Sequence, residues 1–215
     1  PFVTRVDGWE QDGISRLKRT VALAEELGSV RTVVVHPPLR CHWAVIWTTG
    51  GWHWRLPLPL RSGRAYAHWL LEELASFQAG TPVTIALENM PAKRLGPWRL
   101  NRFWFNDLVA LERFPHLTLD TTHLGTWGWD ILEVYERLKA RLAHVHLADY
   151  DGKEHRLPGK GQLPLERLLQ RLVADGFAGA NVVELDPEPL EAGDETMVRA
   201  HLEAACDFCR RCGVG

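Results

Sequence analysis

Strand-like and helix-like segments alternate along nearly the whole chain. Short apolar runs rich in β-branched residues predict five strands, at residues 31–36, 81–88, 117–120, 142–147 and 181–185. Helical spacing of apolar residues predicts helices around them, at residues 14–27, 65–79, 106–113, 130–140, 164–175 and 195–212. Alternation of this kind builds a parallel sheet from βα units, and apolar runs are typical of strands buried on both faces. The sequence therefore predicts an α/β fold.

The composition excludes several classes of protein. The 215 residues carry a formal net charge of −2, with 46% hydrophobic and 24% charged residues, which suits one globular domain over residues 1–215. Near-neutral charge argues against a protein that coats nucleic acid. The apolar runs are far shorter than the ~20 residues of a membrane span, so no membrane partner is expected. Four cysteines and no signal-like start lead us to expect a cytoplasmic protein.

Each predicted strand ends at or near an ionisable residue: His36, Glu88, Asp120, His146 and Glu184. A doubly wound sheet gathers its site at one switch point, whereas a barrel brings every strand end around one circle. This pattern predicts a (β/α)₈ TIM barrel with its active site at the C-terminal face. Such a barrel typically needs about 250 residues. With five strands visible, we expect the N-terminal βα units to be missing from this chain or the barrel to be incomplete.

Three carboxylates and one imidazole in this set point to a metal site. Glu88, Asp120, His146 and Glu184 form a mixed oxygen and nitrogen set that suits Mn²⁺, Zn²⁺, Mg²⁺ or Co²⁺. Glu184 carries most weight, because a lone acid in an apolar strand is costly unless it is paired or metal-bound. Taken singly, Glu88 is as well explained by capping a loop. Asp120 is as well explained by capping a turn that leaves His123 exposed.

The fourth strand and the loop after it hold further candidates. His144 shares a face with His146 but lies deeper, so we expect it to be hydrogen-bonded in the core or to support the site. Asp149 is placed to orient a ring nitrogen of a neighbouring histidine. His155 and Lys160 lie in a loop that is either a solvated turn or, given its position, a lid or substrate loop.

Two aromatic segments bear on substrate. Residues 37–64 form a long insertion whose indoles, Trp43 and Trp54 among them, suit stacking on sugars. A small core or a homo-oligomer contact explains them equally well. Residues 93–104 include Arg94 and Trp98 and hold no acid. This segment is either a phosphate or nucleic-acid contact or a solvated basic loop.

Three cysteines, Cys206, Cys209 and Cys212, are spaced three residues apart on the last predicted helix. Residues at this spacing lie on neighbouring turns and so could share a soft metal ion. Iron–sulfur loops with such spacing are not helical and need a fourth ligand. Helix packing with exposed thiols is therefore the favoured interpretation.

Five motifs, in order over roughly residues 31–186, resemble the xylose isomerase-like TIM barrel superfamily. They are Leu87-Glu88-Asn89, Leu119-Asp120-Thr-Thr-His123, Val145-His146-Leu-Ala-Asp149, His155-Arg-Leu-Pro-Gly-Lys-Gly161 and Val183-Glu184-Leu185. This superfamily includes sugar phosphate isomerases and epimerases and the endonuclease-four type apurinic endonucleases (AP endonuclease family 2). The resemblance implies a (β/α)₈ barrel with a divalent-metal centre at its C-terminal face.

The resemblance also assigns expected roles. In the epimerases, residues matching Glu88, Asp120, His146 and Glu184 hold one metal ion, and the residue matching His123 touches substrate. In the endonucleases, residues matching His36, His123 and His155 add ligands, so that up to three ions are bound.

At three positions the sequence departs from its relatives. Lys153 stands where the endonucleases have an aspartate, with Glu154 next to it but out of register. Arg94 and Gly152 stand where the tagatose- and psicose-type epimerases have a second carboxylate and a basic sugar-binding residue. The superfamily is thus indicated more firmly than the reaction.

The leading expectation is a metal-dependent isomerase or epimerase of a sugar or sugar phosphate. Glu88 and Glu184 would move the proton on the carbon next to the carbonyl, and His123 would hydrogen-bond the substrate. His155 or Lys160 would stabilise developing negative charge. The alternatives are a phosphodiesterase acting on abasic DNA, with nucleic acid as the less favoured partner, and a non-catalytic relative that binds a carbohydrate or a protein partner.

Overall fold

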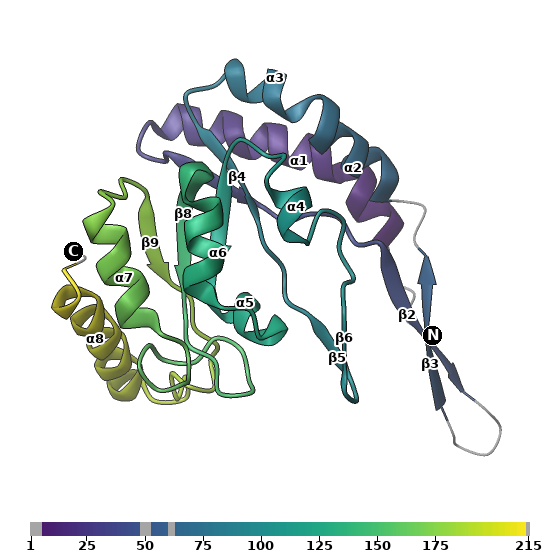
Figure 1. The fold of residues 1–215 in the computed structure, drawn as a ribbon. Coiled ribbons are helices and arrows are strands. Elements are labelled where there is room, and N and C mark those ends of the chain that lie inside the picture. Colours follow the sequence, from purple (N-terminus) through teal and green to yellow (C-terminus); the bar gives the residue numbers. More distant parts are fainter. Residues whose placement is uncertain (1–5, 48–52, 60–62, 214–215) are drawn as a thin grey trace.

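A parallel half-barrel organises the protein (Figure 1). The computed structural model describes residues 6–47, 53–59 and 63–213, with side chains described for 12–40 and 63–213. Its main sheet has the order β1-β4-β7-β8-β9, and each pair of neighbours is parallel. The strands are β1 (Thr32–Val35), β4 (Thr84–Glu88), β7 (Leu117–Asp120), β8 (Leu142–Leu147) and β9 (Ala180–Val183). The predicted α/β fold with a parallel sheet is confirmed.

Helices precede, connect and follow these strands. They are α1 (Val6–Leu27), α2 (Gly63–Glu72), α3 (Leu74–Ala79), α4 (Leu108–Leu111), α5 (Thr121–Trp127), α6 (Ile131–Leu138), α7 (Leu165–Ala174) and α8 (Glu195–Arg211), with a 3₁₀ turn at Lys139–Arg141. None of the helices within the described ranges is long and apolar enough to cross a membrane.

Strand alternation separates the core from the site. Ile85, Leu87, Leu119, Val145 and Leu147 point to the helices and are buried in one apolar cluster. Successive side chains of a strand point to opposite faces, so the residues between them line the inner face of the half-barrel. The last inner-face positions place the ionisable side chains at the C-terminal edge of the sheet.

Two β-hairpins replace segments that the sequence led us to treat as loops. β2 (Cys41–Trp47) pairs with β3 (His53–Pro59), and β5 (Lys93–Leu95) pairs with β6 (Trp98–Leu100). Gly96, with φ of 59°, and Pro97 form the tight turn of the second hairpin. The spacing of apolar residues, on which the strand predictions were based, does not reveal such a turn. Both hairpins project beyond the edge where the strands end (Figure 1). The side chains of Trp43 and Trp54 lie outside the described residues.

Two helix predictions need correction, and one helix was not predicted. The helix expected over residues 65–79 breaks at Glu73 into α2 and α3, and the one expected over 106–113 is only the single turn α4. The turn considered at Asp120 to His123 is the first turn of the unpredicted helix α5. The reason is that the Asp120 side chain caps this helix directly at the end of β7.

Candidate metal centre and active site

Four ionisable side chains converge where the strands end. Glu88, Asp120, His146 and Glu184 each offer one ligand atom, and these atoms all lie within 4.8 Å of one another. Nδ1 of His146 is 3.1 Å from Glu88 Oε1 and 2.8 Å from Glu184 Oε2. The same nitrogen is 3.8 Å from Asp120 Oδ2. The four residues that the sequence pattern grouped are therefore brought together, from β4, β7, β8 and the residue after β9.

The carboxylates of this cluster fit a cation. Asp120 is fully buried, and its Oδ2 has no hydrogen-bond partner. A buried carboxylate oxygen without a partner is costly, and neighbouring carboxylates repel one another unless positive charge lies between them. Carboxylate oxygens with one imidazole are donors typical of divalent metal sites. The cluster thus has the donors and the spacing to bind a metal ion.

The pKa values of the two innermost acids are shifted in opposite directions. Burial pushes the pKa of Glu88 up, but contacts with His146 and His36 outweigh it and hold that pKa at about 2. Burial raises the pKa of Asp120 well above its usual value, and the charge of Glu88 adds to this rise. In the metal-free cluster the charged form is thus favoured at Glu88 and disfavoured at Asp120, and a cation bound between them would favour the charged form of both.

Two histidines lie beside Glu88 and have raised pKa values. His36 Nε2 is 2.9 Å from Glu88 Oε2, and this contact raises the pKa of His36. Burial lowers the pKa of His146, but its contact with Glu88 prevails and the net shift is upward. The contacts with Glu88 thus favour the protonated form of both imidazoles in the metal-free cluster. His36 lies at its edge, where the sequence analysis had placed a possible additional ligand.

Asp120 acts as a cap, as one interpretation of the sequence predicted, and it also faces the cluster of candidate ligands. Its Oδ1 accepts the backbone N–H of His123 at 2.8 Å and caps α5, while Oδ2 faces the cluster. The expectation of an exposed His123 in the turn alternative is wrong, since this histidine is 7% exposed. His123 Nδ1 donates to the carbonyl of Asn89 at 2.8 Å. Burial lowers the pKa of His123 to about 4, so its Nε2 carries a free lone pair.

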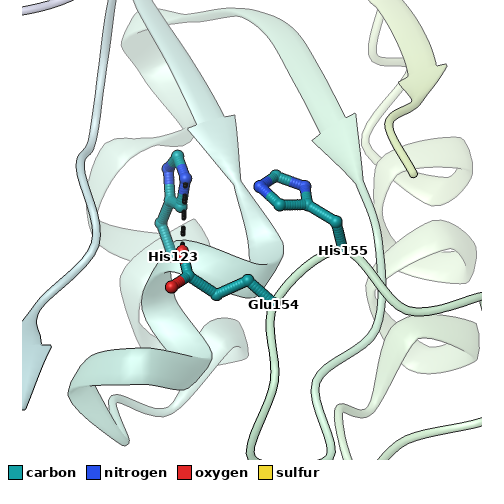
Figure 2. Close-up of side chains that lie close together, drawn as sticks. All are labelled: His123, Glu154 and His155. Carbon is teal, nitrogen blue, oxygen red and sulfur yellow. Dashed lines mark ion pairs between the residues drawn. The ribbon is translucent and has the colours of Figure 1, made fainter. Parts of the chain in front are cut away.

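A second group of ligand atoms adjoins the first (Figure 2). His123, Glu154 and His155 also offer atoms within 4.8 Å of one another. Glu154 Oε2 is 3.9 Å from His123 Nε2, and the two imidazole rings lie edge to face at 5.6 Å. Burial raises the pKa of Glu154. His155 has a positive φ of 52°, a strained conformation that turns its side chain toward α5.

The loop that carries Glu154 and His155 is built around Asp149. This buried carboxylate accepts the backbone N–H groups of Tyr150, Gly159, Gly161 and Leu163 at 2.8–3.0 Å. Asp149 therefore shapes the loop. We had expected it to orient a histidine ring, and it does not. The reason is that the chain folds back over Asp149, so that four backbone N–H groups of the loop occupy its carboxylate oxygens.

The predicted residues differ in how far they are buried. Glu184 is 47% exposed, because β9 is the last strand of the sheet and shields it on one side only. Lys160 is exposed, and so are Arg94 and Trp98 on the β5–β6 hairpin. His144 packs edge to face on His146 at 5.0 Å, and its buried Nδ1 has no hydrogen-bond partner.

The cysteines of α8 lie apart from both ligand groups. Cys209 and Cys212 pack partly buried against the core, and Cys206 is exposed. Burial raises the pKa of the Cys209 thiol, which disfavours the thiolate that a metal would need. This arrangement agrees with helix packing.

Two site residues were not identified from the sequence. Asn89 exchanges two hydrogen bonds with the backbone of Asp120, at 3.0 and 2.8 Å, and so links β4 to β7 beside the cluster. The sequence feature that could have identified Asn89 is its position directly after the glutamate that ends a predicted strand. Glu154 was judged out of register, because the endonuclease pattern places its acid two residues before His155, at Lys153.

Comparison with known proteins places the chain in a family. The family described as "Xylose isomerase-like TIM barrel" matches residues 3–212. An uncharacterized protein of Mycobacterium leprae is 31% identical over 232 residues, covering 94% of this chain and 73% of that relative. A putative hydroxypyruvate isomerase of Streptomyces coelicolor is 39% identical over 82 residues, or 38% of this chain and 28% of the relative.

Solved structures share the fold. The 3-keto-D-glucoside 4-epimerase YcjR of E. coli superposes with a TM-score of 0.65 at 20% identity, over 94% of this chain and 72% of its own. A D-psicose 3-epimerase superposes with a TM-score of 0.67 at 15% identity, over 94% and 71%. At such identities the likeness concerns the fold alone. With the family match over nearly its whole length, the chain belongs to the xylose isomerase-like TIM barrel family.

Proposed function

We propose that the protein is a divalent-metal-dependent isomerase or epimerase of a sugar or sugar phosphate. The observation that carries the proposal is the convergence of Glu88, Asp120, His146 and Glu184 at the C-terminal edge of a half-barrel. Sugar epimerases among the structural neighbours support it, as does a fructoselysine 3-epimerase of Shigella flexneri that is 33% identical over 57 residues.

The four residues would hold one Mn²⁺, Zn²⁺, Mg²⁺ or Co²⁺ ion. Bound there, the metal would polarise the carbonyl and neighbouring hydroxyl of the sugar. The chain's own acids would move the proton. Glu88 comes from β4 and Glu184 from the end of β9, two strands separated in the sheet by β7 and β8. Carboxylates that reach a carbon from opposite sides can remove a proton from one face and return it to the other.

The neighbouring histidines would position the substrate. His123 presents the lone pair of Nε2, because Nδ1 donates to Asn89, and so can accept a sugar hydroxyl. His155 lies beside it and is the better candidate for stabilising developing negative charge, because Lys160 is exposed.

Solvent exchange tests this proposal. The metal-loaded chain is incubated in D₂O with a panel of ketoses, aldoses and their phosphates, and deuterium on carbon is followed by NMR. We expect uptake into at least one substrate. Glu184→Gln should abolish it, whereas Glu203→Gln, which alters an exposed glutamate of α8, should not. No uptake by fully metal-loaded protein would count against the proposal.

The group His123, Glu154 and His155 favours a second candidate, a phosphodiesterase acting on abasic DNA. Glu154 supplies the carboxylate that the sequence pattern had appeared to lack at Lys153. This reaction would use two or three metal ions per chain, whereas the epimerase needs one. Nicking of an abasic duplex together with a stoichiometry above one would favour it. Sugar binding without activity in either assay would indicate a non-catalytic relative.

A further inference from the structure

Glu154 is held in place beside the metal cluster by the residue that follows it. The backbone N–H of His155 donates to Thr122 Oγ1 of α5 at 3.2 Å. The carbonyl of His155 accepts the N–H of Asp186, two residues after Glu184, at 3.2 Å. The loop at Glu154 is therefore bonded on both sides to segments that carry candidate metal ligands.

A single imidazole ring separates Glu154 from the cluster. His123 Nδ1 is 3.4 Å from Glu88 Oε1 and 3.6 Å from Asp120 Oδ1. The other nitrogen of this ring, Nε2, is 3.9 Å from Glu154 Oε2 (Figure 2). A sugar is longer than an imidazole ring, so a sugar bound at the metal centre can also reach Glu154.

His123 Nε2 and Glu154 Oε2 are two hydrogen-bond acceptors that face each other. His123 Nδ1 carries the ring proton, because it lies 2.8 Å from the Asn89 carbonyl, which can only accept. The neutral ring therefore has a lone pair on Nε2. An ionised carboxylate likewise only accepts, and 3.9 Å is too long for a hydrogen bond. Neither atom can satisfy the other, so both can accept from a ligand.

The ligand that fits two facing acceptors carries two neighbouring donors. Adjacent hydroxyls of a sugar each have one proton to donate, so one hydroxyl can bind the imidazole while the next binds the carboxylate. The side chain of Glu154 is 37% exposed and that of His123 is 8% exposed, so the pair is open on the carboxylate side. The pair therefore suits two adjacent hydroxyls of a sugar.

The charge of Glu154 disfavours phosphate at this position. Among the described residues, no lysine or arginine forms an ion pair with its carboxylate. Burial raises the pKa of this carboxyl, and Lys93 opposes that rise without pairing with it. A phosphate dianion next to an unpaired carboxylate is repelled, whereas a hydroxyl can donate to it.

We infer that Glu154 determines specificity: it accepts a sugar hydroxyl next to the one that His123 accepts, and its charge excludes phosphate from that end of the substrate. The inference rests on the proposed function and narrows its substrates to sugars without phosphate at the end that reaches Glu154. In this role Glu154 binds the substrate and not the metal ion.

Calorimetric titration of the metal-loaded chain measures this selectivity. The probes are D-fructose, D-tagatose and D-psicose, each compared with its 1-phosphate and its 6-phosphate. At least one free ketose should bind, and one of its two phosphates should bind about tenfold more weakly. The phosphate that is disfavoured identifies the end of the sugar that reaches Glu154.

Two variants separate the charge of Glu154 from its hydrogen bond. Glu154→Gln keeps an acceptor oxygen and removes the charge, so the disfavoured phosphate should gain about tenfold relative to the free ketose. Glu154→Ala removes both, so the free ketose should bind about tenfold more weakly. Glu203→Gln, at an exposed glutamate of α8, should change neither affinity. Metal content and melting temperature should stay at the wild-type values in all three variants.

Three results would overturn the inference. They are absent binding of all three ketoses, wild-type affinities in both Glu154 variants, and loss of metal in Glu154→Gln, which would make Glu154 a metal ligand. The proposed function is judged separately by deuterium uptake. A selectivity that depends on Glu154 without uptake would retain this role and reject the enzyme, and uptake with unchanged selectivity in Glu154→Gln would do the reverse.

Discussion

Asp120 accepts the backbone N–H of His123 through Oδ1, while Oδ2 of the same carboxylate faces His146 and has no hydrogen-bond partner. One side chain thus starts α5 and supplies a candidate metal ligand. The helix cap fixes the direction of the second oxygen, so the ligand is oriented before any ion arrives. The two roles can be separated by mutation.

Asp120→Asn should keep the cap and lose the charge. Asparagine caps helices about as well as aspartate, so the metal-free protein should keep its stability, whereas Asp120→Ala should lose about 1 kcal/mol. Both variants should bind metal at least tenfold more weakly. Thermal unfolding and metal titration measure the two effects, and wild-type metal affinity in Asp120→Asn would contradict this role.

Removal of the metal should destabilise the fold. An ion that binds only the folded chain stabilises it by about 2.7 kcal/mol at a hundredfold excess over its dissociation constant. A chelator should therefore lower the melting temperature, and added Mn²⁺ or Zn²⁺ should restore it. The shift should be much smaller in Glu184→Gln than in Glu203→Gln. An identical melting temperature with and without chelator would argue against a site in the folded chain.

Metal affinity should rise with pH. The pKa values of His146 and Asp120 are both raised in the metal-free protein, and both groups must lose a proton to coordinate a cation. Binding should therefore release protons below neutral pH, and less at pH 8. Calorimetry in buffers of different ionisation enthalpy measures this release. Proton uptake on binding would contradict the assignment.

The same pKa shifts predict the stability of the metal-free chain. A raised pKa of His146 adds stability that is complete below the unfolded value of about 6.5 and is lost as the pH rises through the folded value. His36 should act in the same direction. His123 and His144, whose pKa values are lowered by burial, act in the opposite direction below about pH 6.5. The contribution of His36 is therefore read from a variant: the free energy of metal-free unfolding of His36→Gln should fall less, or rise more, between pH 6 and 8 than that of the wild-type protein. An identical pH dependence in the two proteins would show that the pairing of His36 with Glu88 is absent.

Asp149→Asn should release the loop of Glu154 and His155. Its amide would turn an N–H₂ group toward some of the four loop amides, and each buried donor left without a partner costs about 1–3 kcal/mol. Gly161→Ala should disturb the same loop, because a Cβ atom at this position would collide with the Asp149 carboxylate. Hydrogen exchange of residues 150–163 should rise in both variants while that of β4 does not. Unchanged protection of the loop would contradict this role of Asp149.

The sequence allowed the strand ends to be predicted but not their surroundings. Glu88, Asp120 and His146 lie at or next to the ends of strands whose alternating apolar residues define the opposite, buried face. Because these strands are parallel and adjacent, their ends meet at one edge of the sheet and the three side chains converge there. Glu154 could not be placed, because its direction depends on the left-handed backbone of His155 and on the four bonds to Asp149. Loop conformations of this kind arise from long-range contacts that no local period records.

The exposure of Glu184 was also beyond the sequence. An acid within an apolar run suggested a buried side chain. Its burial depends on whether strands flank β9 on both sides, and the local sequence does not reveal that β9 is the last strand of the sheet. The hairpin of Lys93 to Leu100 was hidden because a glycine and a proline first suggest a loop. That residues 1–215 form one domain stays a prediction, which cooperative unfolding would test.

Metal content per chain tests the central claim most directly. Chains are loaded, freed of loosely bound ions and measured by mass spectrometry for Mn, Zn, Mg and Co. We expect about one ion in the wild-type protein and in Cys209→Ala, and a marked loss in Glu184→Gln, because the cation lies at the strand ends and not on α8. Loss of metal in Cys209→Ala with full metal content in Glu184→Gln would contradict the account.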